Sequence, residues 1–323
     1  MSIDAEIIAD RRRLRRKLSF WRVLGILSLV AAVVAGGLAV SGRTPFGGVR
    51  PQIARISVGG FIAGSQRMDD LFKRVSEAPA VSGVVIAINS PGGTTTGSEE
   101  LYRGIRELAD KKPTVAFVDG TAASGGYITA LAADHIVARE TSLVGSIGVL
   151  FQYPNFAKLL DTVGVQVEDV KSSPLKAEPS GYKPTSPEAR AALQQVVNDT
   201  FDWFKGLVAD RRHMADADLA KVSTGQIFSG RQGIALKLID EVGGERTAIA
   251  WLERERKVAK DLPVLDWKPR SDRAGFDLWT AAAFGADLLG FDRVGDRLRR
   301  ASGAVGLASL DGLLAVWQPV VEK

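Results

Sequence analysis

The sequence predicts an α/β fold in which a mostly parallel sheet is joined by crossover helices. The first observation is a set of short apolar and β-branched runs, typical of buried strands, at residues 52–58, 83–89, 114–119, 135–138 and 146–150. The second is the helical spacing of apolar residues between several of these runs, at residues 67–78, 97–111 and 124–133. Because strands and helices alternate, neighbouring strands are expected to run parallel.

The first 22 residues form a basic arm. They contain seven arginines and lysines but only three acidic residues, and so hold most of the net charge of +5 of the whole chain. The positive charge is therefore concentrated at the N-terminus and does not line a groove of the folded part. This distribution argues against nucleic acid as a partner.

A segment without charged residues follows the arm, at residues 23–40. As a helix it would be about 27 Å long, close to the thickness of the hydrocarbon core of a bilayer. A cleaved signal peptide is the alternative, but the preceding arm is long and Ala39-Val40-Ser41 is a weak cleavage site. We therefore expect one transmembrane anchor, with residues 1–22 in the cytoplasm and the remainder on the outer face.

The rest of the chain divides into a linker, a folded domain and a tail. Residues 41–51 are rich in Gly, Pro and Arg and predict a linker, and residues 52–260 form the expected domain, which ends with helices at 187–212, 230–237 and 245–257. Polar residues and prolines at 262–273 suggest a second linker. The tail at 261–323 is expected to be helical. Its apolar residues are expected either to form an oligomer interface or to pack on their own protomer. They are Phe276, Trp279, Leu288, Phe291, Leu310, Leu313 and Trp317.

Few residue types in this chain can activate a nucleophile. It has no cysteine, which excludes disulfides and thiolate metal sites, and it has only two histidines. The run N-S-P-G-G at 89–93 follows a predicted strand, and its exposed amides suit an oxyanion or a phosphate, although it is also a common strand-to-helix turn. It lacks both the G-K-[ST] of a nucleotide-binding P-loop and the G-x-G-x-x-G of a dinucleotide site.

Ser124 is the candidate nucleophile. It lies in V-A-F-V-D-G-T-A-A-S-G-G-Y, residues 115–127, after a predicted strand and before a predicted helix. The alternative role for this serine is a helix N-cap. Because parallel strands bring their C-terminal turns to one edge of a sheet, Gly92 or Gly93 and Gly125 are expected to face one substrate carbonyl from two sides.

A serine hydroxyl needs a base, and neither histidine suits this role. His135 follows Ser124 by eleven residues, about 16 Å along a helix, and His213 lies in a charged stretch. A lysine can serve if burial lowers its pKa, and Lys171 and Lys176 are the candidates. We expect Ser146 to hydrogen-bond the ammonium of such a lysine and to orient it.

Four motifs in this order resemble the signal peptide peptidase A family, the membrane-anchored Ser/Lys peptidases of the bacterial envelope. They are N-S-P-G-G at 89–93, A-A-S-G-G-Y at 122–127, G-S-I-G-V at 145–149 and K-S-S-P-L-K at 171–176. The later run at 225–244, from G-Q-I-F-S-G to D-E-V-G-G, is similar as well. The resemblance covers roughly residues 50–260, and it implies a fold of the Clp-protease/crotonase type.

The resemblance also implies a role for each matching residue. Ser124 matches the nucleophile, Lys176 the general base, and Ser146 the serine that hydrogen-bonds the lysine. The turn at Gly92 and Gly93, with the amide of Gly125, matches the oxyanion hole, and no metal or cofactor is needed. Two positions depart from the family pattern, Val144 where threonine is frequent and Thr94 where glycine is frequent; Lys171 and Lys183 remain alternatives to Lys176.

The expected function is that of a serine endopeptidase, anchored in the bacterial inner membrane by one span, with its catalytic domain on the periplasmic or outer face. Its expected substrates are hydrophobic peptides such as remnant signal peptides. The resemblance implies a bowl-shaped homo-oligomer in which, among short members of the family, serine and lysine come from adjacent protomers. Two alternatives remain, a crotonase-like acyl-CoA enzyme and a non-catalytic membrane scaffold.

Overall fold

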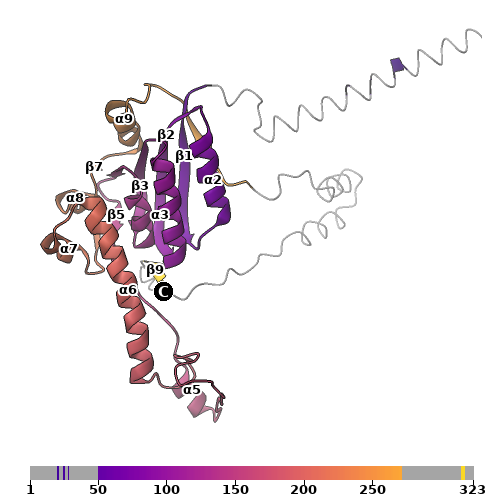
Figure 1. Cartoon of the computed structure of the whole chain (residues 1–323), viewed down its shortest axis with the longest axis vertical. Coiled ribbons are helices and arrows are strands. Elements are labelled where there is room, and N and C mark those ends of the chain that lie inside the picture. The colour runs from indigo at the N-terminus through magenta and orange to yellow at the C-terminus, as the bar shows by residue number, and fades with distance from the viewer. Residues whose placement is uncertain (1–19, 22–24, 26–27, 29–49, 271–313, 317–323) are drawn as a thin grey trace, which may run out of the picture. The chain divides into compact units, whose positions relative to one another are not determined.

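The computed structural model describes residues 20–21, 25, 28, 50–270 and 314–316 (Figure 1). Apart from residues 25 and 28, the predicted anchor at 23–40 lies outside these residues, as does most of the predicted tail. Within the described part of the chain, no helix combines the length and the apolar character needed to cross a bilayer.

The described residues contain a nine-stranded sheet whose central path runs β6-β5-β3-β2-β1-β8. Most neighbouring strands are parallel, which confirms the predicted mostly parallel sheet. Among the strands that the structure describes, only β5–β6 and β2–β9 pair antiparallel. The strands are β1 Gln52–Ile62, β2 Val81–Thr94, β3 Thr114–Ala123, β4 His135–Ala138, β5 Leu143–Gly145, β6 Ile227–Ser229, β7 Glu241–Val242, β8 Val264–Trp267 and β9 Leu314–Val316.

The helices in this part of the chain connect the strands or extend from the sheet. Their bounds are α2 Gln66–Glu77, α3 Thr95–Ala109, α4 Gly125–Leu131, α5 Ala157–Thr162, α6 Pro187–Arg212, α7 Asp216–Val222, α8 Gly230–Ala235 and α9 Glu245–Glu255. Local chemistry explains where the longest one begins, because Ser186 accepts a hydrogen bond from the amide of Ala189 and a proline occupies the first turn.

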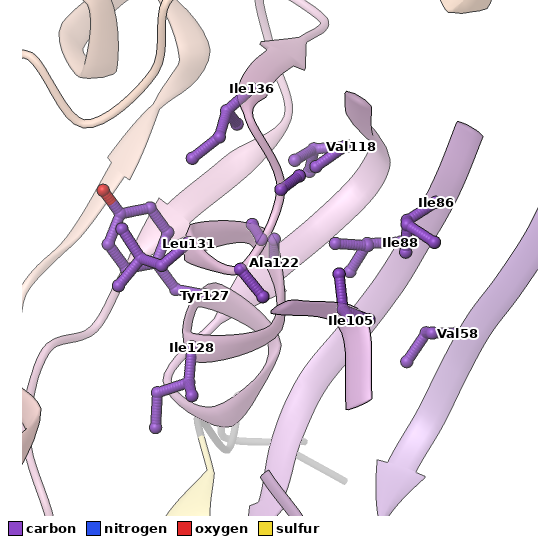
Figure 2. Packing of buried hydrophobic residues seen from close by; sticks show 14 of the residues in the cluster. Val58, Ile86, Ile88, Ile105, Val118, Ala122, Tyr127, Ile128, Leu131 and Ile136 are labelled. Carbon is purple, nitrogen blue, oxygen red and sulfur yellow. The ribbon is translucent and has the colours of Figure 1, made fainter. Parts of the chain in front are cut away.

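The sheet lies between two apolar clusters because its strands are buried on both faces. On β2, Val84, Ile86 and Ile88 belong to the larger cluster, whereas Val85 belongs to the smaller one. Helices α3 and α4 cover the first face, where Ile105, Ile128 and Leu131 pack on the strands (Figure 2), and α9 covers the second. The sheet therefore has a buried apolar layer on each face.

Three sequence predictions are corrected by the structure. No strand forms at 146–150; β5 ends at Gly145, because Gly145 and Ser146 both adopt positive φ (92° and 52°) and turn the chain away. The second linker at 262–273 is interrupted by β8, which pairs with β1 and is fixed by the ion pair between Arg55 and Asp266 (2.5 Å). Both β8 and β9 fall in the segment 261–323 that was expected to be helical.

Candidate active site

The candidate site lies at the edge where β1, β2 and β3 end. Ile62 of β1 is opposite Gly93 of β2, and Ser90 of β2 is opposite Ala122 of β3. Ser124 follows β3 directly, so the glycines of β2 and the serine reach the same edge of the sheet. This register places the turns after β2 and β3 at the same edge.

Ser124 adopts a strained backbone conformation, with φ 54° and ψ −116°. A non-glycine residue at positive φ costs of order 1–3 kcal/mol and persists only where surrounding structure imposes it. Here the amide of Ser124 donates to Gly145 O at 2.8 Å, and the residue is buried. Its hydroxyl does not cap α4, and its one hydrogen-bond acceptor among the described residues is Gly148 O at 3.5 Å. Ser124 therefore occupies the N-cap position of α4, but its side chain does not act as the cap.

Ser146 directly follows β5, the strand that pairs with the end of β3. Ala123 of β3 is opposite Gly145 of β5, so the two serines follow directly on paired residues of parallel strands. Ser146 has positive φ (52°), is buried, and donates its amide to Gln226 O at 2.8 Å. The structure thus brings together two of the predicted site residues.

Glycine is required at the end of β2. A Cβ atom on Gly93 would lie 1.8 Å from Ile62 O, and Gly92 has φ 109°. The amide of Gly92 donates to Ser90 Oγ at 3.1 Å, and the same hydroxyl donates to Gly60 O at 2.7 Å. Gly92 therefore already has an acceptor, which makes Gly93 the better candidate of the pair for an oxyanion donor.

Gly125 begins α4, so its amide has no acceptor within that helix. The next residue, Gly126, has no room for a side chain, because a Cβ would lie 2.6 Å from Ser90 O. Close packing therefore holds the first turn of α4 against the end of β2.

Sequence reasoning did not single out Ser90 or Tyr127. Both are fully buried, and Ser90 lay in a motif that was interpreted only through its glycines. The Tyr127 hydroxyl donates to Leu238 O at 2.7 Å, and burial raises its pKa. This bond ties the helix that follows Ser124 to a distant loop.

The structure does not bring a lysine to Ser124 within one chain. Lys176 is exposed on the segment between α5 and α6, and its side chain has no polar partner among the described residues. This segment and α5 lie at the end of α6 that is remote from the sheet (Figure 1). The N-terminal half of α6 buries only Ala189. The segment from residue 150 to this half of α6 therefore extends from the domain as an arm, distinct from the basic arm at residues 1–22.

The two alternative lysines are engaged in ion pairs on that arm. Lys171 contacts Asp169 (2.7 Å) and Glu178, and Lys183 also contacts Asp169. Hydrogen bonds that the Lys171 ammonium donates to Asp169 and to Glu178 raise the pKa of Lys171, which opposes a role as proton acceptor. Of the three candidates, Lys176 is therefore the one whose ammonium has no carboxylate beside it.

The histidines are used elsewhere in the fold. His135 stacks on Trp251 with ring centroids 4.5 Å apart, and burial lowers its pKa. His213 ends α6 in a left-handed conformation. Among the residues that the structure describes, no group of three or more acidic or imidazole side chains is arranged to hold a metal ion.

Comparison with known proteins gives one consistent family. The model of peptidase family S49 matches residues 106–259. The putative protease MJ0651 of Methanocaldococcus jannaschii is 38% identical over 192 residues, which cover 59% of this chain and 60% of the relative. The putative protease slr0021 of a Synechocystis strain is 36% identical over 62% of this chain and 73% of its own length.

A third relative is the putative signal peptide peptidase SppA of Enterococcus faecium, which is 31% identical over 71% of this chain and 70% of its own length. From the family match, the relatives and this geometry together, we conclude that the chain belongs to peptidase family S49, the signal peptide peptidase A family of serine peptidases.

Proposed function

We propose that this protein is an endopeptidase that uses a Ser/Lys dyad to cleave hydrophobic peptides, such as signal peptides that remain in the membrane. The carrying observation is Ser124, which is buried at positive φ, next to Ser146, with a hydroxyl that is not used as a helix cap. Such a strained turn between a strand and a helix is typical of the nucleophile in several hydrolases.

In the proposed reaction, Ser124 Oγ attacks the scissile carbonyl while neutral Lys176 Nζ accepts the hydroxyl proton. The amides of Gly93 and Gly125 donate to the negative oxygen of the tetrahedral intermediate. Lys176 then gives the proton to the leaving amine, and the peptide bond breaks to leave an acyl ester on Ser124. Water hydrolyses this ester with the same lysine as base.

We propose that the lysine comes from a second copy of the chain. In support, Lys176 is remote from Ser124 in its own chain, and the arm exposes a run of large apolar side chains that a monomer would leave in water. These are Leu150, Phe156, Leu159, Val163, Val165, Val167, Val170 and Leu175. A homo-oligomer would cover this surface and bring each lysine to a neighbouring serine.

The site assignment is tested by labelling with a fluorophosphonate, which acylates activated serines. The full-length protein in detergent should gain one adduct, mapped by peptide mass spectrometry to Ser124, and Ser124→Ala should gain none. The matched control is Ser142→Ala, which removes another buried serine whose hydroxyl donates to Val118 O at 2.9 Å. Labelling that persists in Ser124→Ala would rule out this nucleophile.

We also propose that the protein is anchored in the bacterial inner membrane by residues 23–40, with the catalytic domain outside. The support is that residues 23–40 carry no charge and directly follow the basic residues 1–22. Protease added to intact spheroplasts should digest the part after residue 50. Complete protection, or a soluble mature chain that begins near residue 42, would contradict this placement.

A further inference from the structure

The pairing of β1 with β2 is irregular just before the candidate oxyanion donor. On β1 one residue, Gly60, separates two regularly paired positions, whereas on β2 two residues, Ser90 and Pro91, separate their partners. Such a bulge disrupts the ladder of backbone hydrogen bonds locally. Proline adds to this disruption, because Pro91 has no N–H to donate. Backbone groups at this point of the two strands therefore need partners other than those of a regular ladder.

The side chain of Ser90 supplies these partners. Its hydroxyl donates to Gly60 O at 2.7 Å and accepts a hydrogen bond from the amide of Gly92 at 3.1 Å. Ser90 is fully buried, so both bonds are shielded from competition by bulk water. One hydroxyl thus joins the two strands across the bulge, directly before Gly93, the better candidate of the glycine pair for an oxyanion donor.

The backbone of Ser90 reaches the segment that carries the other candidate donor. Its carbonyl oxygen lies against the first turn of α4, where a Cβ on Gly126 would approach it to 2.6 Å. Gly125 begins this turn. Ser90 therefore contacts both parts of the candidate oxyanion hole, the end of β2 through its hydroxyl and the start of α4 through its carbonyl.

The direction of each amide decides whether an oxyanion hole works, because its donors must point at the place where the negative oxygen forms. Gly92 has φ 109°, and glycine has more backbone freedom than any other residue type. The hydrogen bond from the Gly92 amide to Ser90 Oγ fixes the peptide plane that precedes this glycine. The direction of the next amide, that of Gly93, then depends on this restraint.

We propose that Ser90 is a positioning residue of the active site, whose hydroxyl holds the Gly93 amide in the direction that stabilises the oxyanion. This inference rests on the proposed function, because it takes Gly93 and Gly125 as the oxyanion donors for attack by Ser124. In this role Ser90 exchanges no proton with the substrate. Since the negative charge exists only in the transition state and the intermediate, loss of the hydroxyl lowers kcat and leaves KM unchanged.

The proposal is tested by Ser90→Ala in the full-length protein in detergent. For a fluorogenic hydrophobic peptide, kcat should fall about 10–100-fold while KM stays within about twofold, as expected for a displaced donor. The matched control is Ser142→Ala, since this serine is similarly buried and its hydroxyl donates to Val118 O at 2.9 Å. The control should keep its kcat. An unchanged kcat in Ser90→Ala, or an equal fall in the control, would overturn the proposal.

A second measurement separates positioning from a general loss of packing. The aldehyde of the same peptide adds to an active-site serine as a tetrahedral hemiacetal and so mimics the intermediate. Its inhibition constant should rise in Ser90→Ala by about the factor by which kcat falls. Uncleaved peptide should bind the Ser90→Ala, Ser124→Ala double variant as tightly as Ser124→Ala alone. Weakened binding of the peptide, or an unchanged inhibition constant, would contradict a positioning role.

If Ser90→Ala does not fold, Ser90→Cys decides the question. A thiol has nearly the shape of the hydroxyl but is a weak hydrogen-bond donor and acceptor. The kcat of Ser90→Cys should therefore fall at an unchanged KM. A kcat equal to that of the unchanged protein would overturn the proposal.

These results separate the two proposals. If Ser124→Ala retains cleavage, the proposed mechanism fails whatever the Ser90 variants show. If Ser124→Ala is inactive while Ser90→Ala keeps its kcat, the mechanism stands and the positioning role of Ser90 is rejected.

Discussion

Replacement of Lys176 by alanine should slow peptide cleavage by at least about 10²–10⁴-fold, the usual cost of removing a catalytic base. Without the amine, neither histidine replaces it, because His135 stacks on Trp251 and His213 ends α6. Lys176→Arg should be equally inactive, because a guanidinium stays protonated. Initial rates with a fluorogenic hydrophobic peptide, measured on the full-length protein in detergent, give the comparison.

The matched controls are Lys171→Ala and Lys183→Ala, which remove the ion-paired lysines of the same arm and should retain most activity. Mixing inactive Ser124→Ala with inactive Lys176→Ala copies should restore measurable cleavage, because some sites then combine an intact serine with an intact lysine of another copy. If Lys176→Ala stays active and one of the controls is inactive, the base has been assigned to the wrong lysine. If all three variants stay active, a Ser/Lys mechanism is excluded.

Among single changes at the end of β2, Gly93→Ala should be the most damaging. The new Cβ would lie 1.8 Å from Ile62 O, a backbone atom that moves only if β1 and β2 separate. We expect a clear fall in the thermal unfolding temperature and, in any protein that folds, at least about 10²–10³-fold slower cleavage from the misplaced oxyanion donor. Thermal unfolding followed by circular dichroism, together with the cleavage assay, measures both effects.

Gly59→Ala is the control on the neighbouring strand. Its Cβ would lie 3.6 Å from Asn89 O, an ordinary contact, so stability and activity should stay close to those of the unchanged protein. Normal unfolding and normal cleavage by Gly93→Ala would show that this strand is neither tightly packed nor part of the oxyanion hole.

Elements that are specified by neighbouring residues could be predicted from the sequence. The predicted helix at 187–212 matches α6, because its cap at Ser186 and the proline that follows are local signals. The strand β8 was missed because it is stabilised by pairing with β1 some 200 residues earlier, a contact with no local signal. The prediction of a strand at 146–150 was wrong because Ser146 has positive φ, and serine as a residue type does not favour that conformation.

The candidate site shows the same division. Ser124 and the glycines could be selected from the sequence because they follow apolar strands in glycine-rich turns. That Ser124 and Ser146 lie side by side depends on the register of β3 and β5, which no local pattern states. The antiparallel pairing of β9 with Gly92–Thr94 was not predicted either, because it joins segments more than 200 residues apart.

All seven residues of α4, the helix that follows Ser124, are buried. Any change of size in this helix therefore disturbs the packing of the domain and the position of the hydroxyl at the same time. Evolution of a new peptide preference has little freedom there, since variants that altered the nucleophile would also be lost through misfolding. We expect natural diversity among such enzymes to accumulate in the segment between β5 and α6, where many side chains are exposed and a substitution has little cost to the core.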